Sequence, residues 1–144
     1  MEKLVHTLAE FEAEAAHFSE KLASSQRATL VTLSGELGAG KTAFTKVVAR
    51  SFGIEETVTS PTFVLEKIYQ LSADKPFKKL VHIDAYRLES GADLSLLGFD
   101  ELMQDARTLV LLEWPEKVVS ALPTPVVHIS ITAHDDGSRT IMYG

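Results

Sequence analysis

Residues Gly35–Thr42 read GELGAGKT and decide the fold, because they fit the phosphate-binding pattern G-x-x-x-x-G-K-[ST]. Such a loop follows a β-strand and opens a helix. Residues 29–33 form a β-branched, apolar run that predicts the strand. Residues 41–52 carry apolar side chains at helical spacing, which predicts the helix. Both flanks therefore agree with the motif.

The residue types within this loop suit a bound triphosphate. Gly35, Gly38 and Gly40 allow the backbone to curl, so that successive N–H groups form an anion nest at a helix N-terminus. Lys41 can reach the β- and γ-phosphates, and the Thr42 hydroxyl can bind Mg²⁺. The alternative, a glycine-rich turn before a helix, does not require Lys-Thr at this offset.

Length and composition favour one compact domain over residues 1–144, since 45% of the 144 residues are hydrophobic. Acidic residues outnumber basic ones, 20 to 14, for a formal net charge of -6, and no Lys/Arg-rich run appears. A broad nucleic-acid surface is therefore not expected, and a partner would hold any RNA. The absence of cysteine excludes disulfides, thiolate catalysis and zinc sites built on cysteine.

The sequence shows no targeting or membrane-spanning signal. Its start, Met-Glu-Lys, lacks the apolar core that is typical of a signal peptide. The longest purely aliphatic run, residues 109–112, is far too short to span a bilayer. These features predict a soluble, cytoplasmic protein without membrane association.

The N-terminal part of the chain predicts a helix over residues 7–22, since apolar side chains recur at three- and four-residue steps. Thr7 is placed to cap this helix, and Glu10, three residues later, completes a capping box. The helix after the phosphate-binding loop is expected to end at Phe52. Gly53 then suits the left-handed position beyond the helix end.

A segment rich in hydroxyl groups, residues 57–63, reads TVTSPTF and predicts a loop. The hydroxyls of Thr59, Ser60 and Thr62 come about twenty residues after the phosphate-binding loop. Proteins with such a loop often place there a segment that senses the γ-phosphate. The open alternative is an ordinary turn that leads into a strand over residues 63–71.

Two strands are expected to end in acids. Residues 80–84 read LVHID, the form of a Walker B strand, whose carboxylate (here Asp84) meets Mg²⁺ directly or through water. A helix-capping Asp is the alternative. Residues 108–112 form another aliphatic strand, which Glu113 and Trp114 follow. Because that strand end points to the edge that carries the phosphates, Glu113 is a candidate to bind Mg²⁺ or to position the attacking water. Packing is the alternative for the Glu-Trp pair.

Two side chains near these strands carry weaker signals. His82 faces the opposite side of its strand from Ile83, and we expect it to be packed or hydrogen-bonded rather than catalytic. The five histidines show no metal-ligand spacing. Arg87 is the best-placed cation for a salt bridge or a phosphate contact, with an exposed surface arginine as the alternative.

The remaining segments complete an alternating pattern of helices and strands. Two short helices are expected within residues 89–105 and another over 116–122. Residues 126–132 and 139–143 predict strands, which an Asp-Gly turn joins into a hairpin. This hairpin would form an antiparallel edge on the sheet.

Four motifs in this order together resemble the TsaE (formerly YjeE) family, small ATPases of bacterial tRNA N6-threonylcarbamoyladenosine synthesis. The motifs are GELGAGKT, VTSPTF, HIDAYRL and LLEWP. The resemblance covers roughly residues 5–130. Most relatives have Asp where this chain has Glu36, and many have Thr where it has Ala43, but neither change removes a phosphate or metal ligand. The C-terminal hairpin carries no motif of the family.

The resemblance implies an α/β fold of the P-loop NTPase type, a three-layer sandwich with a mixed central sheet and a C-terminal antiparallel hairpin. It implies ATP and Mg²⁺ as cofactors, with Lys41, Asp84 and Glu113 as catalytic residues. The implied metal ligands are Thr42, Glu113 and Asp84. The residues implied to contact the nucleotide are Glu36, Leu37, Gly38, Ala39, Gly40, Lys41, Thr42, Ala43, Thr59, Ser60 and Thr62, with Thr7 and Glu10 near the base. Those at the active-site edge are Tyr86, Arg87 and Trp114.

The resemblance also implies that the partners are TsaD and TsaB, and that tRNA is reached through their complex. TsaE does not itself attach the threonylcarbamoyl group. Its ATP hydrolysis is needed for the TsaD–TsaB complex to turn over repeatedly at adenosine 37 of ANN-reading tRNAs. No glutamine or arginine finger can be assigned from the sequence. We therefore expect slow hydrolysis by the chain alone, and faster hydrolysis when a partner orders residues 59–63.

Two other functions remain open at this point. A small-molecule kinase usually has a lid with several arginines, whereas the five arginines here are scattered, at positions 27, 50, 87, 107 and 139. A GTPase-like switch or nucleotide sensor usually selects guanine with an [NT]KxD motif. This chain has no asparagine and no T-K-x-D sequence.

Overall fold

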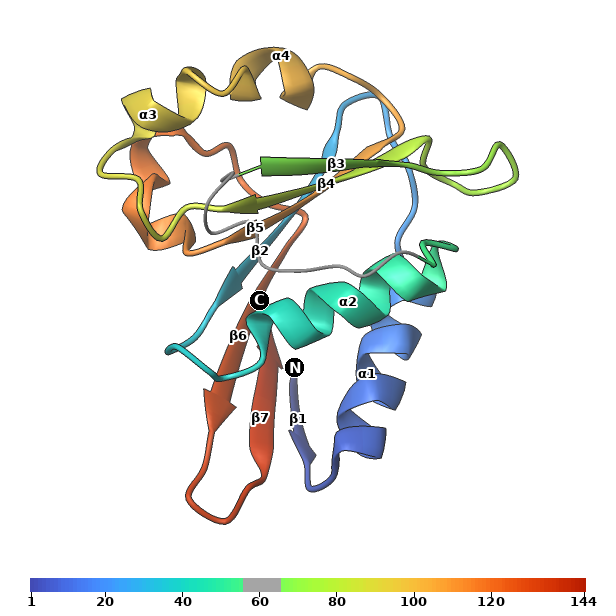
Figure 1. Ribbon diagram of the computed structural model, residues 1–144, viewed down its shortest axis with the longest axis vertical. Helices are drawn as coiled ribbons and strands as arrows, with labels where there is room; N and C mark the ends of the chain where they lie inside the picture. Colours follow the sequence, from blue (N-terminus) through green and yellow to red (C-terminus); the bar gives the residue numbers. More distant parts are fainter. Residues whose placement is uncertain (56–65) are drawn as a thin grey trace.

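The fold is built on one mixed β-sheet, shown in Figure 1 by a computed structural model that describes residues 1–55 and 66–144. Within these residues the sheet has seven strands in the order β1-β7-β6-β2-β5-β4-β3. The strands are β1 Glu2–Val5, β2 Thr29–Ser34, β3 Glu66–Gln70, β4 Lys79–Asp84, β5 Thr108–Glu113, β6 Val127–Ala133 and β7 Arg139–Tyr143. The predicted mixed sheet and α/β class are confirmed.

The centre of the sheet is parallel, and its margins are antiparallel. Strand β2 pairs in parallel with β5 and β6, and β5 pairs in parallel with β4. Strand β3 joins β4 antiparallel, and β7 lies antiparallel between β6 and β1. All six residues of β5 are buried, which explains why this strand reads as a continuous apolar run rather than an alternating one.

Helices cover both faces of the sheet and give the three-layer arrangement (Figure 1). Helices α1 (Leu8–Glu20) and α2 (Lys41–Ser51) pack on one face, against side chains that include Leu109 and Leu111 of β5. Helices α3 (Gly91–Ser95) and α4 (Phe99–Met103) pack on the other, against Val110 and Leu112. Successive β5 residues thus face opposite layers. No helix in the described ranges has both the length and the apolar character needed to cross a membrane.

The predicted cap at the start of α1 and the predicted glycine after the end of α2 are both present, although α1 ends at Glu20, two residues before the predicted end. The Thr7 hydroxyl accepts a hydrogen bond from the Glu10 N–H at 3.1 Å, and the Glu10 carboxylate accepts one from the His6 N–H at 2.7 Å. At the end of α2, Gly53 has φ +89°, and the N–H groups of Gly53 and Ile54 donate back to the carbonyls of Arg50 and Ala49. The last pair of bonds is a Schellman motif, which satisfies carbonyls that the helix leaves open.

The N-terminal strand was not predicted. Strand β1 is four residues long and shows no clear alternation, and its register is set by β7, more than 130 residues away in sequence. The predicted hairpin of β6 and β7 forms, with Gly137 at φ +87° in its turn. The expectation that this hairpin forms the sheet edge is wrong, however, because β1 adds beyond β7.

The helix predicted over residues 116–122 is also wrong. Two short 3₁₀ turns, Pro115–Lys117 (η1) and Val119–Ala121 (η2), take its place, because the backbone of Val118 (φ -133°) breaks the helical path. The two short helices expected within 89–105 are present as α3 and α4. The strand predicted over 63–71 is described only from Glu66. The predicted loop at 57–63 lies outside the described residues.

Candidate functional site

The candidate site lies where β2, β4 and β5 end beside the first turn of α2. The loop of residues 35–40 joins β2 to α2. Asp84 pairs directly with Glu113 across the parallel strands β4 and β5, and Glu113 in turn pairs with Leu33 of β2. This register brings the two predicted acids to the same edge as the phosphate-binding loop, as is usual for ligand sites of open α/β sheets. Their roles toward a metal stay predictions.

Two glycines of the loop are required by their surroundings. A Cβ on Gly35 would lie 2.6 Å from the carbonyl oxygen of Ile131 in β6, closer than real Cβ atoms come. Gly40 has φ +122°, a conformation that L side chains rarely adopt, and a Cβ there would lie 3.2 Å from the ring of Phe11 in α1. The loop therefore passes tightly between α1 and the hairpin.

The Lys41 side chain folds back over its own loop. Its ammonium donates to the carbonyl of Gly35 at 2.5 Å and to that of Glu36 at 2.9 Å. It also lies 4.4 Å from the centre of the Trp114 ring. Burial lowers the pKa of Lys41, and the nearby carboxylates of Glu113, Asp84 and Glu116 oppose this shift. The loop thus holds a buried cation at the point where phosphates are expected.

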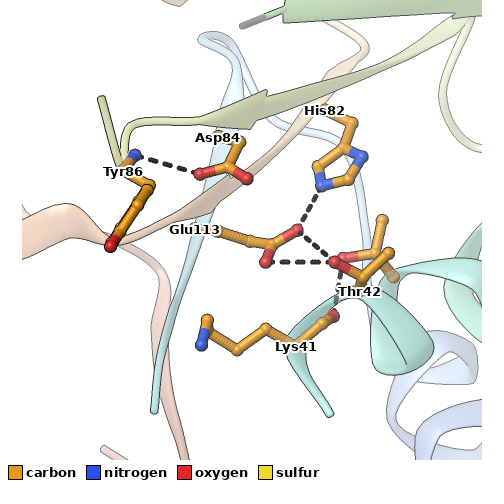
Figure 2. Close-up of polar contacts among 7 residues, drawn as sticks. Lys41, Thr42, His82, Asp84, Tyr86 and Glu113 are labelled. Atoms are coloured by element: carbon orange, nitrogen blue, oxygen red, sulfur yellow. Dashed lines mark hydrogen bonds and ion pairs between the residues drawn. The ribbon is translucent and has the colours of Figure 1, made fainter. Parts of the chain in front are cut away.

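Glu113 connects α2 to the sheet (Figure 2). The Thr42 hydroxyl donates toward its two carboxylate oxygens, at 3.3 and 3.2 Å. His82 of β4 contacts the same carboxylate, with its Nε2 2.5 Å from Oε2. Glu113 is only 2% exposed and His82 is fully buried. The side chains of Thr42, His82 and Glu113 therefore form one small polar cluster between the first turn of α2 and strands β4 and β5.

Asp84, Tyr86 and Trp114 border this cluster. The Asp84 carboxylate accepts a hydrogen bond from the Tyr86 N–H at 3.0 Å, so Asp84 also fixes the turn that follows β4 (Figure 2). The rings of Tyr86 and Trp114 lie 5.0 Å apart. Trp114 has φ +62°, a strained conformation for a non-glycine residue. Such strain is typical of positions that the surrounding structure fixes for function.

A cavity of about 400 Å³ opens over the cluster. A second, of about 440 Å³, lies on the side of the loop that faces β6. The first is lined by Leu37, Gly38, Gly40, Lys41, Thr42, Ala43, Asp84, Tyr86, Glu113, Trp114 and Arg139. The second is lined by Gly35, Glu36, Leu37, Gly38, Ala39, Ile131, Thr132 and Ala133. The predicted residues at positions 36–43, 84, 86, 113 and 114 therefore all line one or both of these cavities, which lie on either side of the same loop.

Other predicted site residues are not brought to this cavity. Thr7 and Glu10 cap α1, and neither lines the first cavity. Arg87 is exposed and does not line it either. Thr59, Ser60 and Thr62 lie outside the described residues. The proximity of α1 to the loop comes through Phe11, one turn beyond Thr7.

Sequence reasoning missed two residues of the site. Arg139, at the start of β7, lines the first cavity, and its guanidinium lies 5.6 Å from the Phe11 ring centre. No local signal distinguishes this arginine, because only the long-range pairing of the sheet places it near the loop. The role of His82 toward Glu113 was also missed, although its presence two residues before Asp84 on the same strand face was visible.

The donor set fits a magnesium ion that arrives with a nucleotide. Mg²⁺ usually keeps several waters and binds one or two carboxylates together with substrate phosphates. The Thr42 hydroxyl and the Glu113 carboxylate, with Asp84 beside them, supply such donors. Among residues 1–55 and 66–144, no cluster of three or more His, Cys, Asp or Glu side chains would hold a metal by itself. The chemistry of this donor set therefore suits a phosphate-bound ion.

Comparisons with known proteins agree with this architecture. Residues 9–141 match the family described as threonylcarbamoyl adenosine biosynthesis protein TsaE. The chain is 40% identical over 116 residues to the tRNA threonylcarbamoyladenosine biosynthesis protein TsaE of Treponema pallidum, a match that covers 81% of this chain and 82% of the relative. It is 33% identical over 135 residues to the protein of the same name from Rickettsia bellii, with 92% and 90% covered.

A solved structure shares the fold. The crystal structure of Bacillus subtilus YdiB superposes with a TM-score of 0.77 at 30% identity, over 99% of this chain and 83% of that one. The mixed sheet, the flanking helices and the loop between β2 and α2 thus belong to a known architecture.

Proposed function

This chain belongs to the TsaE family, and from that premise we propose that it is an accessory ATPase of tRNA threonylcarbamoyladenosine biosynthesis. The observation that carries the ATPase proposal is the Thr42 hydroxyl directed at the buried Glu113 carboxylate, beside the Lys41 ammonium on the same loop. A hydroxyl, a carboxylate and a lysine at a helix N-terminus are the set that phosphate-loop enzymes use for a nucleoside triphosphate.

Phosphoryl transfer needs positioning and charge neutralisation more than covalent help from the protein. The loop N–H groups and the N-terminus of α2 bind the phosphates, and the Lys41 ammonium offsets their charge. Mg²⁺, when bound, adds charge stabilisation at the phosphate oxygens, and Thr42, Glu113 and Asp84 are the residues that would hold it. Because Glu113 is buried, bulk water would screen its interaction with a bound cation less than that of an exposed carboxylate.

Lys41 must change partners when phosphate binds. In the structure its ammonium is bonded to the neutral carbonyls of Gly35 and Glu36. An anionic phosphate oxygen is a stronger acceptor for an ammonium than a neutral carbonyl. We therefore expect the Lys41 ammonium to break at least one of these two hydrogen bonds when it binds phosphate.

We further propose that the chain acts in the cytoplasm, together with TsaD and TsaB, and contacts tRNA through that complex. The net charge of -6 gives the chain no broad attraction for a polyanion, which favours a protein-mediated route to tRNA. Hydrolysis by the isolated chain is expected to be slow, because no glutamine is among the described residues that line the cavity.

The test reconstitutes the reaction with purified TsaB, TsaD, an ANN-reading tRNA and an activated donor of the threonylcarbamoyl group. We expect repeated t6A formation only when this chain and ATP are both present, and association with TsaB and TsaD in at least one nucleotide state. Failure to associate with ATP, with ADP and without nucleotide would contradict the partner assignment. Fast turnover by the isolated chain, on the order of tens per second, would contradict the need for a partner.

A further inference from the structure

A buried histidine contacts the carboxylate on which the proposed chemistry depends. The His82 side chain is 0% exposed and that of Glu113 is 3% exposed, and their closest atoms, Nε2 and Oε2, are 2.5 Å apart. The same Glu113 oxygen also lies 3.2 Å from the Thr42 hydroxyl (Figure 2). Oε2 of Glu113 is therefore within hydrogen-bond distance of both His82 and Thr42.

The strand register explains why His82 lies behind the site rather than within it. His82 and Asp84 are two residues apart on β4, so both side chains project toward the α2 layer. Asp84 pairs with Glu113, whereas His82 pairs with Leu111, one step further into the sheet. Asp84 and Glu113 line the main cavity, and His82 does not. Any influence of His82 on a bound nucleotide must therefore pass through Glu113.

The hydrogen-bond pattern assigns the tautomer of the ring. His82 Nδ1 is buried and has no hydrogen-bond partner in the described parts of the chain. A proton on Nδ1 alone would bury an unpaired N–H group and would leave two acceptors, Nε2 and Oε2, facing each other. A proton on Nε2 removes both problems. The ring therefore donates from Nε2–H to the Glu113 carboxylate.

We propose that His82 is a positioning residue that holds the Glu113 carboxylate in place toward Thr42, and through it toward the magnesium ion of a bound nucleotide. This inference rests on the proposed ATPase function. A carboxylate turns easily about its last side-chain bond. The Nε2–H bond anchors one oxygen and so restricts that rotation. Partners of this kind, one step behind a metal ligand, typically affect metal affinity or activity by about 10–100-fold.

The test compares His82→Ala and His82→Gln with Val81→Ala in the full chain. Val81 precedes His82 on β4, is fully buried, and packs on the opposite face of the sheet, so its truncation weakens the fold without touching Glu113. A glutamine can place an amide N–H near the position of the ring Nε2–H. Thermal unfolding reports the stability of each variant. ADP binding in EDTA, and the Mg²⁺ concentration that half-saturates ADP binding and ATP hydrolysis, report the site.

We expect His82→Ala to raise the half-saturating Mg²⁺ concentration by about 10–100-fold while ADP affinity in EDTA stays unchanged. His82→Gln should recover much of the loss, and Val81→Ala should keep the wild-type Mg²⁺ dependence whatever its stability. A folded His82→Ala protein with wild-type Mg²⁺ dependence overturns the proposal, as does an equal shift in Val81→Ala.

If His82→Ala does not fold, nitrogen NMR of the wild-type ring decides the question. A proton on Nε2 supports the proposal, whereas a ring protonated only on Nδ1 cannot donate to Glu113 and overturns it. A wild-type chain that binds no nucleotide contradicts the proposed function instead. The NMR measurement on the nucleotide-free protein still reports the His82–Glu113 contact in that case, so the two failures are distinguishable.

Discussion

The ammonium of Lys41 lies 4.4 Å from the centre of the Trp114 ring, and two carbonyls of the phosphate-binding loop hold it there. A cation over an indole face is attracted by the ring quadrupole, most strongly where water is excluded. Trp114 is the only tryptophan of the chain. The contact therefore links the position of the Lys41 ammonium to a single fluorescent side chain.

This link predicts that nucleotide binding changes the fluorescence of Trp114. When Lys41 turns toward phosphate, its ammonium leaves or shifts over the indole ring, and the emission should change in a saturable way with added ADP or ATP. Lys41→Ala should abolish most of the change, and Lys46→Ala, an exposed lysine of the same helix, should preserve it. A fluorescence titration of the three proteins tests this, and an unchanged signal at saturating nucleotide would contradict it.

Loss of the Lys41 ammonium should remove productive phosphate binding. We expect Lys41→Ala to reduce ATP hydrolysis on the order of 100-fold or more. Removal of one preorganised donor that stabilises charge in the transition state typically lowers the rate by that factor. Steady-state phosphate release and calorimetric ADP binding measure the effect, with Lys46→Ala as the matched control. Wild-type hydrolysis by Lys41→Ala would remove the lysine from the mechanism.

Loss of the Glu113 carboxylate should affect hydrolysis more than binding. Glu113→Ala removes the acceptor of the Thr42 hydroxyl, and we expect Mg²⁺-dependent hydrolysis to fall on the order of 100-fold. ADP affinity measured in EDTA should change little, because loop N–H groups and Lys41 bind the phosphates. Glu101→Ala, which removes an exposed acid of α4, is the control. If hydrolysis by Glu113→Ala equals that of the wild type, the metal role of Glu113 should be dropped.

The sequence correctly predicts that the loop, Asp84 and Glu113 lie together, because these residues are local in sequence or lie at strand ends. The glycines, lysine and threonine of Gly35–Thr42 predict the shape of that loop from local sequence alone. Apolar runs that end in Asp84 and Glu113 predict two strands whose ends lie at the same edge of the sheet. Arg139 could not be placed in this way, since only the pairing of β7 with β1 and β6 brings it near the loop. Strand β1 was missed for the same reason, because four residues without a clear pattern acquire their structure from distant partners.

The charge cluster at the opposite end of β4 predicts a pH-dependent stability. Lys78 and Lys79 contact the two oxygens of Asp105 at 2.7 and 2.8 Å, and these bonds lower the pKa of Asp105 to about 2. A lowered pKa means that the ionised form stabilises the folded state. The contribution is therefore complete above the unfolded pKa, near 4, and is lost as pH falls toward about 2.

Asp105→Asn should accordingly lower Tm at pH 7 by a small amount. Exposed pairs contribute roughly 0.5 kcal/mol, which corresponds to about 1–2 °C in a chain of this size. The difference between Asp105→Asn and wild type should shrink in 0.5 M salt and disappear near pH 2, because salt screens the pair and protonation removes it. Melting curves at pH 7 and at the lowest pH where both proteins fold measure it. A difference that grows as pH falls would show that the sign is wrong.

The tight passage of the phosphate-binding loop past β6 predicts a steric effect at Gly35 that is absent at Gly38. A Cβ at Gly35 would lie 2.6 Å from the Ile131 carbonyl oxygen, whereas a Cβ at Gly38 meets nothing within 4 Å. Gly38→Ala therefore costs only backbone strain, about 1–2 kcal/mol at φ +81°. Gly35→Ala adds a backbone clash, and we expect a loss of about 3 kcal/mol or more in unfolding free energy. Urea unfolding of both variants compares them directly, and equal losses would contradict the close contact between the loop and β6.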